Sequence, residues 1–163
     1  MRTIEAEKIT NTVAQLCKDT NYNLGEDVIT AYKESLAAED SEVAQEILEQ
    51  LIENAEIAEK KEVPICQDTG MAVVFLEVGQ EVKIIGDDLN AAVNEGVREG
   101  YEEGYLRKSV VSDPLIERKN TGDNTPSVIH TTIVPGSDVK ITVAPKGFGS
   151  ENMSQMKMFN PTA

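Results

Sequence analysis

Apolar side chains recur at helical spacing over much of the N-terminal part of the chain. They lie three to five positions apart in residues 4–17, again in 28–36 and again in 41–60, and therefore fall on one face of each segment. Glutamates cover most of the remaining surface of the third segment, which is typical of a solvated helix face. We predict three amphipathic helices, the first of which ends near Asn21.

The pattern changes to that of β-strands after Pro64, because proline halts helical continuation. Residues 71–78 are rich in β-branched and aromatic side chains and predict a strand, and residues 82–85 predict a second, shorter one. Glycine and aspartate at 86–88 then supply the turn and N-cap of another helix, at about residues 89–101. This part of the chain is therefore expected to be mixed α/β.

The remaining sequence combines a long polar loop with a predicted hairpin. Residues 105–126 have no sustained periodicity, and we expect an ordered loop, since loops of this length in compact domains are usually functional or disordered. Alternating segments at 128–134 and 139–143 are joined by Pro-Gly-Ser-Asp, whose turn chemistry predicts a β-hairpin. The methionine-rich tail predicts the start of a helix, with Ser150 as its cap.

Together these elements predict one α+β domain over residues 1–163, helical in 1–62 and mixed α/β in 63–163. The N-terminal helices are expected to pack on a small, mainly antiparallel sheet. No stretch approaches the roughly 20 apolar residues of a membrane helix, and the N-terminus lacks the apolar core of a signal peptide. We therefore expect a cytoplasmic protein with no membrane partner.

The charge of the chain narrows the class of ligand. A formal net charge of -14 argues against nucleic-acid binding, because such proteins need a positive surface to displace counterions from phosphates. The acidic excess lies in residues 1–104, whereas residues 105–163 carry seven basic and five acidic side chains. A locally basic segment in an acidic chain favours an anionic small ligand, and chance clustering is the alternative explanation.

The first candidate site is a polar cluster between a predicted helix and a predicted strand. Cys66, Gln67, Asp68 and Thr69 place a thiol, an amide, a carboxylate and a hydroxyl in succession on one turn. The alternative is structural, because free cysteine is often buried as a small hydrophobe and Asp-Thr-Gly is common in turns. Cys17, on the apolar face of the first predicted helix, fits that structural interpretation better than a ligand role.

Two further polar segments are candidates for binding an anion. Arg107 and the segment RKNTGDNTP, at 118–126, combine cationic groups with amides and hydroxyls, which is the chemistry that fixes carboxylates; Asx turns would explain the same residues equally well. Glycines in KGFGSEN, at 146–152, permit close approach to the backbone, although no Walker pattern is present. His130 could serve as a base, but a lone histidine in a strand is more often structural.

The motifs ICQDTG, LRKSVVSDPL, RKNTGDNTPSVIH and VAPKGFGSENMS, in this order and at these intervals, resemble the alpha subunit of class I fumarases and L(+)-tartrate dehydratases. The resemblance implies a hydro-lyase that interconverts fumarate and L-malate in the TCA cycle, or that dehydrates tartrate. It further implies a 4Fe-4S cluster held by three cysteine thiolates, whose open iron acts as a Lewis acid on the dicarboxylate substrate. A beta subunit or C-terminal domain would complete the active site in a homo- or hetero-oligomer.

The same motifs imply roles for individual residues. Cys66 would be a cluster ligand, and Gln67 and Asp68 would face the substrate, with Asp68 as the candidate for proton handling. Arg107 would clamp a substrate carboxylate, and the backbone at Gly149 would approach the substrate closely. The residues that would shape this pocket without reacting are Asn120, Thr121 and Asp123.

The chain departs from the family pattern in its cysteines and its length. Cys66 alone falls in a matching motif, and the chain stops at Ala163, where family members continue. We therefore expect an N-terminal fragment that by itself holds no intact cluster and has no activity. The other hypothesis is a non-catalytic binding or assembly domain for anionic metabolites. Apolar residues of the tail indicate either self-association or fraying: Met153, Met156, Met158 and Phe159.

Overall fold

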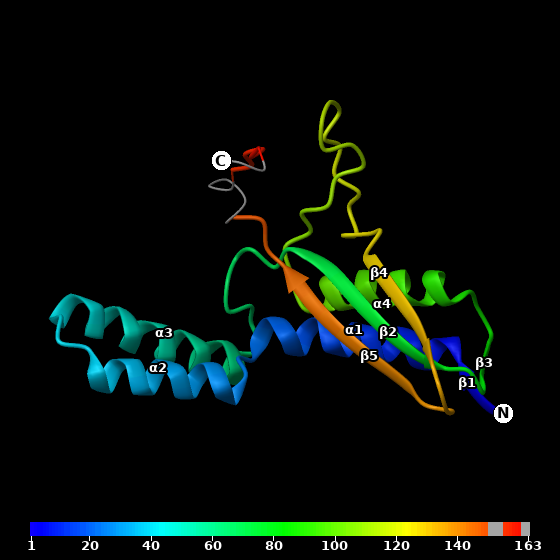
Figure 1. The fold of residues 1–163 in the computed structure, drawn as a ribbon, viewed down its shortest axis with the longest axis horizontal. Coiled ribbons are helices and arrows are strands. Elements are labelled where there is room, and N and C mark those ends of the chain that lie inside the picture. The colour runs from blue at the N-terminus through cyan, green and yellow to red at the C-terminus, as the bar shows by residue number, and fades with distance from the viewer. Residues whose placement is uncertain (150–154, 161–163) are drawn as a thin grey trace.

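The computed structural model describes residues 1–149 and 155–160 and has the α+β architecture expected from the sequence (Figure 1). Its helices are α1 (Ala6–Tyr22), α2 (Glu26–Ala38), α3 (Glu42–Lys61) and α4 (Leu89–Glu103). Its strands are β1 (Arg2–Glu5), β2 (Met71–Gly79), β3 (Val82–Ile85), β4 (Val128–Val134) and β5 (Val139–Lys146). The four helices predicted before residue 105 and all four predicted strands are present at close to their expected places.

A three-stranded sheet forms the centre of the fold, with β2 between β4 and β5. Strand β2 runs parallel to β4, with Val74 opposite Ile129, and antiparallel to β5, with Val74 opposite Val143. A second sheet pairs β1 with β3, also in parallel. The expectation of a mainly antiparallel sheet is therefore wrong, because two of the three strand pairings are parallel. The long connection from β2 to β4, which includes α4, is the kind of crossover that a parallel pair requires.

The predicted hairpin between β4 and β5 does not form. Both strands pair with β2, and the turn that joins them passes around its end: the N–H of Gly79 donates to the Asp138 carbonyl over 2.8 Å, and the N–H of Gln80 donates to the Val134 carbonyl over 2.9 Å. The physical reason is that β2 is a buried strand whose two edges both need hydrogen-bonding partners. Turn chemistry is local and contains no information about this third strand.

Helices α1 and α4 pack against each other and cover one face of the three-stranded sheet (Figure 1). The core between these layers is formed by residues of both helices and of the sheet: Ile9, Val13, Cys17, Val93, Val97, Tyr101, Val74, Leu76 and Val143. Glycines bring the two helices together. A Cβ at Gly96 would lie 2.5 Å from the Thr10 carbonyl oxygen, and one at Gly100 would lie 2.7 Å from that of Ala14. The contact between the helices therefore depends on glycine at both positions.

Only the first of the three N-terminal helices packs on the sheet, so the expectation that all three do so is corrected. Helices α2 and α3 pair with each other and extend away from the sheet, at the left of Figure 1. Helix α2 has no buried residue, and α3 leaves Val43 66% and Ile47 52% exposed. Helix α2 covers only part of the apolar face predicted for α3. The rest of this face, which includes Val43 and Ile47, is exposed.

Two local differences concern the ends of the chain. The segment Arg2–Glu5 forms β1 beside β3, whereas the sequence predicts the start of a helix at residue 4. The described tail residues, 155–160, are not helical, and the predicted cap at Ser150 and the apolar Met153 lie outside the described residues. Over the part of the chain that the structure describes, no helix is both long and apolar enough to cross a bilayer.

Candidate functional site at the Cys66 turn

The candidate site is the turn of residues 62–70, which leads from α3 into β2. It begins at Glu62, which has left-handed backbone angles (φ 50°) and ends the helix. Two hydrogen bonds hold the backbone of Ile65 in place. Its N–H donates to the Asn21 carbonyl over 2.9 Å, and its carbonyl accepts from Asn54 Nδ2 over 2.9 Å. The next three side chains, Cys66, Gln67 and Asp68, are exposed at the surface.

The Cys66 thiol is exposed, and its sulfur accepts a hydrogen bond from the N–H of Asp68 over 3.4 Å. A hydrogen bond of this kind orients a side chain that binds a metal. Cys17 is different, because it is 1% exposed between α1 and α4, and burial raises the pKa of its thiol to about 12. Of the two cysteines, Cys66 is therefore the accessible one, and Cys17 is a core residue, which agrees with its structural interpretation.

Asp68 faces the segment that follows β5. Its Oδ2 accepts a hydrogen bond from the N–H of Phe148 over 3.1 Å. A Cβ at Gly147 would lie only 2.8 Å from the same oxygen, and one at Gly149 would lie 4.0 Å from it. The structure thus brings two of the predicted site residues together, Asp68 from the turn before β2 and Gly149 from the segment after β5. Glycine at 147 is what permits this approach.

Arg107 is joined to the same turn through its backbone. The Thr69 hydroxyl donates to the Arg107 carbonyl over 2.9 Å, across 38 positions of sequence. The guanidinium itself is exposed and forms no ion pair with any described residue. An arginine in this state is available to bind a carboxylate from solution. Gln67 is likewise exposed beside Cys66.

The other loop residues implied by the motifs support the loop itself. Asn120 Nδ2 donates to the Lys108 carbonyl over 2.9 Å, and the Thr121 N–H donates to the Val110 carbonyl over 3.0 Å. Burial acts to raise the pKa of Asp123, but hydrogen bonds from Thr125 and the nearby Arg98 outweigh it, so that the pKa of this carboxyl is lowered. Asp123 is therefore a charged acceptor inside the loop.

His130 takes no part in this arrangement. It lies in the middle of β4, directly opposite Phe75 of β2, and the two rings stack with centroids 5.0 Å apart. The two cross-strand neighbours lie on the sheet face opposite the one that α1 and α4 cover. The arrangement agrees with the structural interpretation of this histidine.

Two buried residues that hold the site together were not assigned a role from the sequence. Tyr101 of α4 donates its hydroxyl to the Thr69 carbonyl over 2.7 Å, and Asn124 Nδ2 donates to the Gly70 carbonyl over 3.1 Å. Asn124 was visible as part of the polar loop, but nothing in its spacing separated it from its exposed neighbours. Tyr101 had only the apolar periodicity of its helix.

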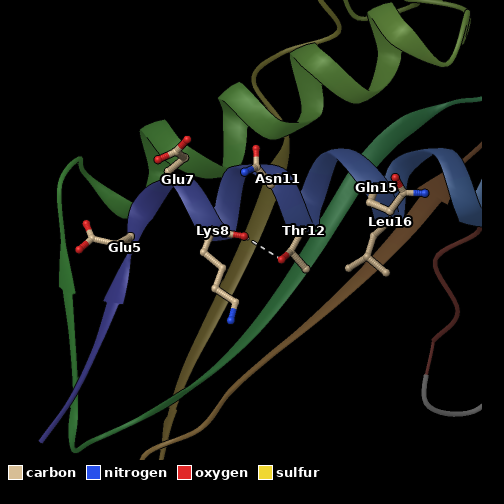
Figure 2. A pocket seen from close by; sticks show the side chains of 7 residues that line it. All are labelled: Glu5, Glu7, Lys8, Asn11, Thr12, Gln15 and Leu16. Carbon is tan, nitrogen blue, oxygen red and sulfur yellow. Dashed lines mark hydrogen bonds between the residues drawn. The ribbon is translucent and has the colours of Figure 1, made fainter.

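The hollow drawn in Figure 2 lies elsewhere, along α1. It is lined by side chains of mixed character: Glu5, Glu7, Lys8, Asn11, Thr12, Gln15 and Leu16. The one hydrogen bond drawn there, from the Thr12 hydroxyl to the Lys8 carbonyl over 2.7 Å, is an ordinary bond within a helix. This hollow shares no residue with the Cys66 turn. We therefore assign the candidate site to the turn, which carries an exposed thiol and a carboxylate and is joined to the backbone of Arg107.

A metal cluster can be fitted to this site only in part. The described residues contain no group of three or more histidine, cysteine or acidic side chains that could hold a metal ion. Cys66 by itself has the exposure and the N–H···S hydrogen bond of a metal ligand. The chain therefore offers one thiolate position at the turn, and a cluster with three cysteine ligands would need two from elsewhere.

Several known proteins are similar to this chain over nearly its whole length. The chain is 38% identical over 95% of its length to a protein of Methanocaldococcus jannaschii provisionally named L(+)-tartrate dehydratase subunit alpha, of which it covers 56%. It is 32% identical over 94% of its length to the anaerobic class I fumarate hydratase of Escherichia coli, of which it covers 28%. It is 28% identical to an Escherichia coli L(+)-tartrate dehydratase subunit alpha, of which it covers 52%.

The chain thus spans about half or less of the length of these relatives. The family model described as fumarate hydratase (Fumerase) matches residues 10–163, which include the Cys66 turn, Arg107 and the segment after β5. This match covers nearly the whole chain. The chain belongs to the fumarate hydratase (Fumerase) family.

Proposed function

We propose that this chain is the N-terminal domain of the alpha part of an iron-sulfur hydro-lyase. The complete enzyme would hydrate fumarate to L-malate reversibly, or dehydrate L-tartrate. The observation that carries the proposal is that hydrogen bonds join the turn of residues 62–70 both to the backbone of Arg107 and to the segment after β5. The exposed Cys66 thiol and the Asp68 carboxylate, which Phe148 N–H holds, lie on the turn itself, and Arg107 is joined to the turn from a second segment by the hydrogen bond between its carbonyl and the Thr69 hydroxyl. The names of the relatives support the reaction class.

Cys66 would hold one iron of a 4Fe-4S cluster. When bound, the cluster supplies a Lewis acid that stabilises the oxygen leaving the 2-hydroxy acid. The N–H of Asp68 supports this role, since hydrogen bonds to the ligating sulfurs help to set the reduction potential of such a cluster. The two further thiolates would come from a beta subunit or from a C-terminal domain, because Cys17 is enclosed between two helices.

The other residues of the turn would bind and orient the substrate. Arg107 would hold one substrate carboxylate through two parallel N–H···O bonds, which fixes its orientation as well as its position. Gln67 would hydrogen-bond the same substrate, and the Gly149 backbone would close the opposite side. Asp68 would move a proton, and its hydrogen bond from Phe148 N–H holds the carboxylate in place for that task.

The assembly would be an oligomer located in the cytoplasm, where thiols such as Cys66 remain reduced. Residues 1–163 would form one domain of this assembly. The apolar strip of α3 that α2 leaves exposed supports contact with another part of the enzyme.

The test is an anaerobic assay of the complete enzyme with L-malate and with L-tartrate, which also identifies the substrate. Cys66→Ser should abolish both the iron-sulfur absorbance and turnover, whereas Cys17→Ser should retain both. If Cys66→Ser keeps its affinity for malate and the wild-type enzyme has no turnover with either acid, the alternative is correct, and the chain is a binding or assembly domain for anionic metabolites.

A further inference from the structure

We propose that Thr69, Asn124 and Tyr101 are positioning residues that set the place of Arg107 relative to the Cys66 turn. They act through a closed ring of hydrogen bonds behind the exposed site. The inference rests on the proposed function, because it assigns the ring to the binding of a dicarboxylate by Arg107. The ring itself is a feature of the described residues and can be tested separately.

Asn124 provides one side of the ring. It is fully buried, and its Oδ1 accepts from the N–H of Ser109 over 2.8 Å and from that of Val110 over 3.1 Å. Its Nδ2 donates to the Gly70 carbonyl over 3.1 Å. One amide side chain thus joins the start of the 105–126 loop to the start of β2. An amide is required here, since the residue must accept on one side and donate on the other.

Thr69 provides the opposite side. Its side chain is buried, and its hydroxyl donates to the Arg107 carbonyl over 2.9 Å. The path therefore closes on itself: from Gly70 through Asn124 to Ser109, along the backbone to Arg107, and through the Thr69 hydroxyl back to Gly70. A closed path fixes the relative position of its two backbone segments, whereas a single hydrogen bond would leave a hinge. The two segments are those that carry Arg107 and Cys66.

Tyr101 fixes the ring to the core. It is 1% exposed, and its hydroxyl donates to the Thr69 carbonyl over 2.7 Å. Burial raises the pKa of this hydroxyl, so it remains a protonated donor across the physiological range. Because α4 is packed against α1 over its length, the ring is held in one place relative to the core of the domain.

Two control variants distinguish a positioning role of these residues from a purely structural one. The chain offers a second buried tyrosine of the same kind, Tyr22, whose hydroxyl donates to the Gly104 carbonyl over 3.0 Å outside the ring. Tyr22→Phe therefore removes a comparable hydrogen bond without touching the ring, and it serves as the matched control for Tyr101→Phe. Thr69→Ser keeps the hydroxyl and serves as the rescue for Thr69→Val.

The experiment compares these four variants in the complete enzyme. We expect Thr69→Val and Tyr101→Phe to raise KM for the dicarboxylate about fivefold or more and to change kcat less, because Arg107 is misplaced while the chemistry at Asp68 is intact. Thr69→Ser and Tyr22→Phe should leave KM unchanged. In the same preparations, amide exchange at Ser109 and Val110 should rise about tenfold in the first pair and stay constant in the second.

Two results would overturn the inference. One is an unchanged KM in Thr69→Val and Tyr101→Phe, together with a loss of thermal stability no different from that of Tyr22→Phe; the ring would then be structural only. The second result applies if the complete enzyme turns over neither malate nor tartrate. The proposed function then fails, and amide exchange at Ser109 and Val110 is the remaining test of the ring. Unchanged exchange at Ser109 and Val110 would then overturn the ring, and a rise confined to the ring variants would support it.

Discussion

The Phe148 N–H donates to Asp68 Oδ2 over 3.1 Å, which joins two residues 80 positions apart in sequence. The contact follows from strand register. Because β2 and β5 are antiparallel, with Met71 opposite Lys146, the turn before β2 lies beside the segment after β5. A Cβ at Gly70 would lie 2.2 Å from the Lys146 carbonyl, so glycine is also needed on the side of the turn. The candidate site thus lies at the edge of the sheet where β2 begins and β5 ends.

This contact predicts that structure and activity respond differently to changes at Asp68. Asp68→Ala removes the acceptor, and amide exchange at Phe148 should rise about tenfold. Asp68→Asn keeps an oxygen that can accept the N–H, so exchange should remain close to that of the wild type. Turnover of the complete enzyme should be lost in both, since only a carboxylate can take the proton. Activity in Asp68→Asn close to that of the wild type would exclude Asp68 from proton transfer.

The two thiols should differ sharply in reactivity. Cys66 is exposed and Cys17 is 1% exposed, so a chromogenic disulfide reagent at pH 8 should modify one thiol per native molecule quickly. The second thiol should react only after unfolding. Cys66→Ser should remove the fast phase and Cys17→Ser should leave it intact. Two thiols reacting at similar rates in the native protein would contradict the burial of Cys17.

Replacement of Arg107 should weaken substrate binding without damage to the fold. Arg107→Lys keeps the charge but loses the paired N–H donors, and we expect KM for the dicarboxylate to rise about tenfold, equivalent to about 1.4 kcal/mol. Arg118→Lys is the control, because Arg118 Nε donates only to the Pro114 carbonyl of its own loop. Equal effects of the two changes on KM would mean that Arg107 is not a specific clamp, since an arginine outside the site would then matter as much.

An added methyl group at the glycine contact between α1 and α4 should destabilise the fold. Gly100→Ala would place a Cβ 2.7 Å from the Ala14 carbonyl oxygen and 2.8 Å from Cys17 Cβ, and we expect a loss of about 1–3 kcal/mol in the free energy of unfolding. In Gly25→Ala the new atom would contact only the flexible Asp27 side chain. That change should cost about 0.5 kcal/mol, as a weaker N-cap. Chemical denaturation of both variants measures the difference.

Cys17 should also make the fold sensitive to alkali. Its pKa rises from 9.0 to about 12 on folding because of burial, so its contribution to stability is complete below pH 9 and is lost as the pH rises toward 12. By pH 10 the loss should be on the order of 1 kcal/mol. Tyr101, whose pKa is also raised by burial, adds to the loss only above pH 10. In Cys17→Ala, the unfolding free energy should fall less between pH 9 and pH 10 than in the wild type.

Local sequence patterns were sufficient for the helices. In α1 and α4, apolar spacing and the Asp88 N-cap, whose carboxylate accepts from the N–H groups of Asn90 and Ala91, determine where each element lies. They were insufficient for strand pairing, because the Pro-Gly-Ser-Asp turn has the same chemistry whether its strands pair with each other or with a third strand. The short β1 was missed because four residues carry too little periodicity to compete with the helix that follows.

For the candidate site, the sequence singled out residues whose roles stay predictions. Family motifs identified the chemical groups at Cys66, Asp68, Arg107 and Gly149 before any contact between them was known. The buried residues that hold these groups were not predicted. Asn124, for example, differs from its neighbours only in its hydrogen-bond partners across the fold, and its sequence context is that of any polar loop. The extended pair of α2 and α3 was also not predicted, since an amphipathic pattern does not reveal which element covers it.

The order of strands in the sheet has a consequence for protein synthesis. Strand β2, nine residues long and apolar on its inner face, is complete before α4, the 105–126 loop and both of its partners have left the ribosome. During that interval its two edges are unpaired, the condition in which strands associate with other chains. The nascent chain is therefore most exposed to aggregation between the release of β2 and the release of β5.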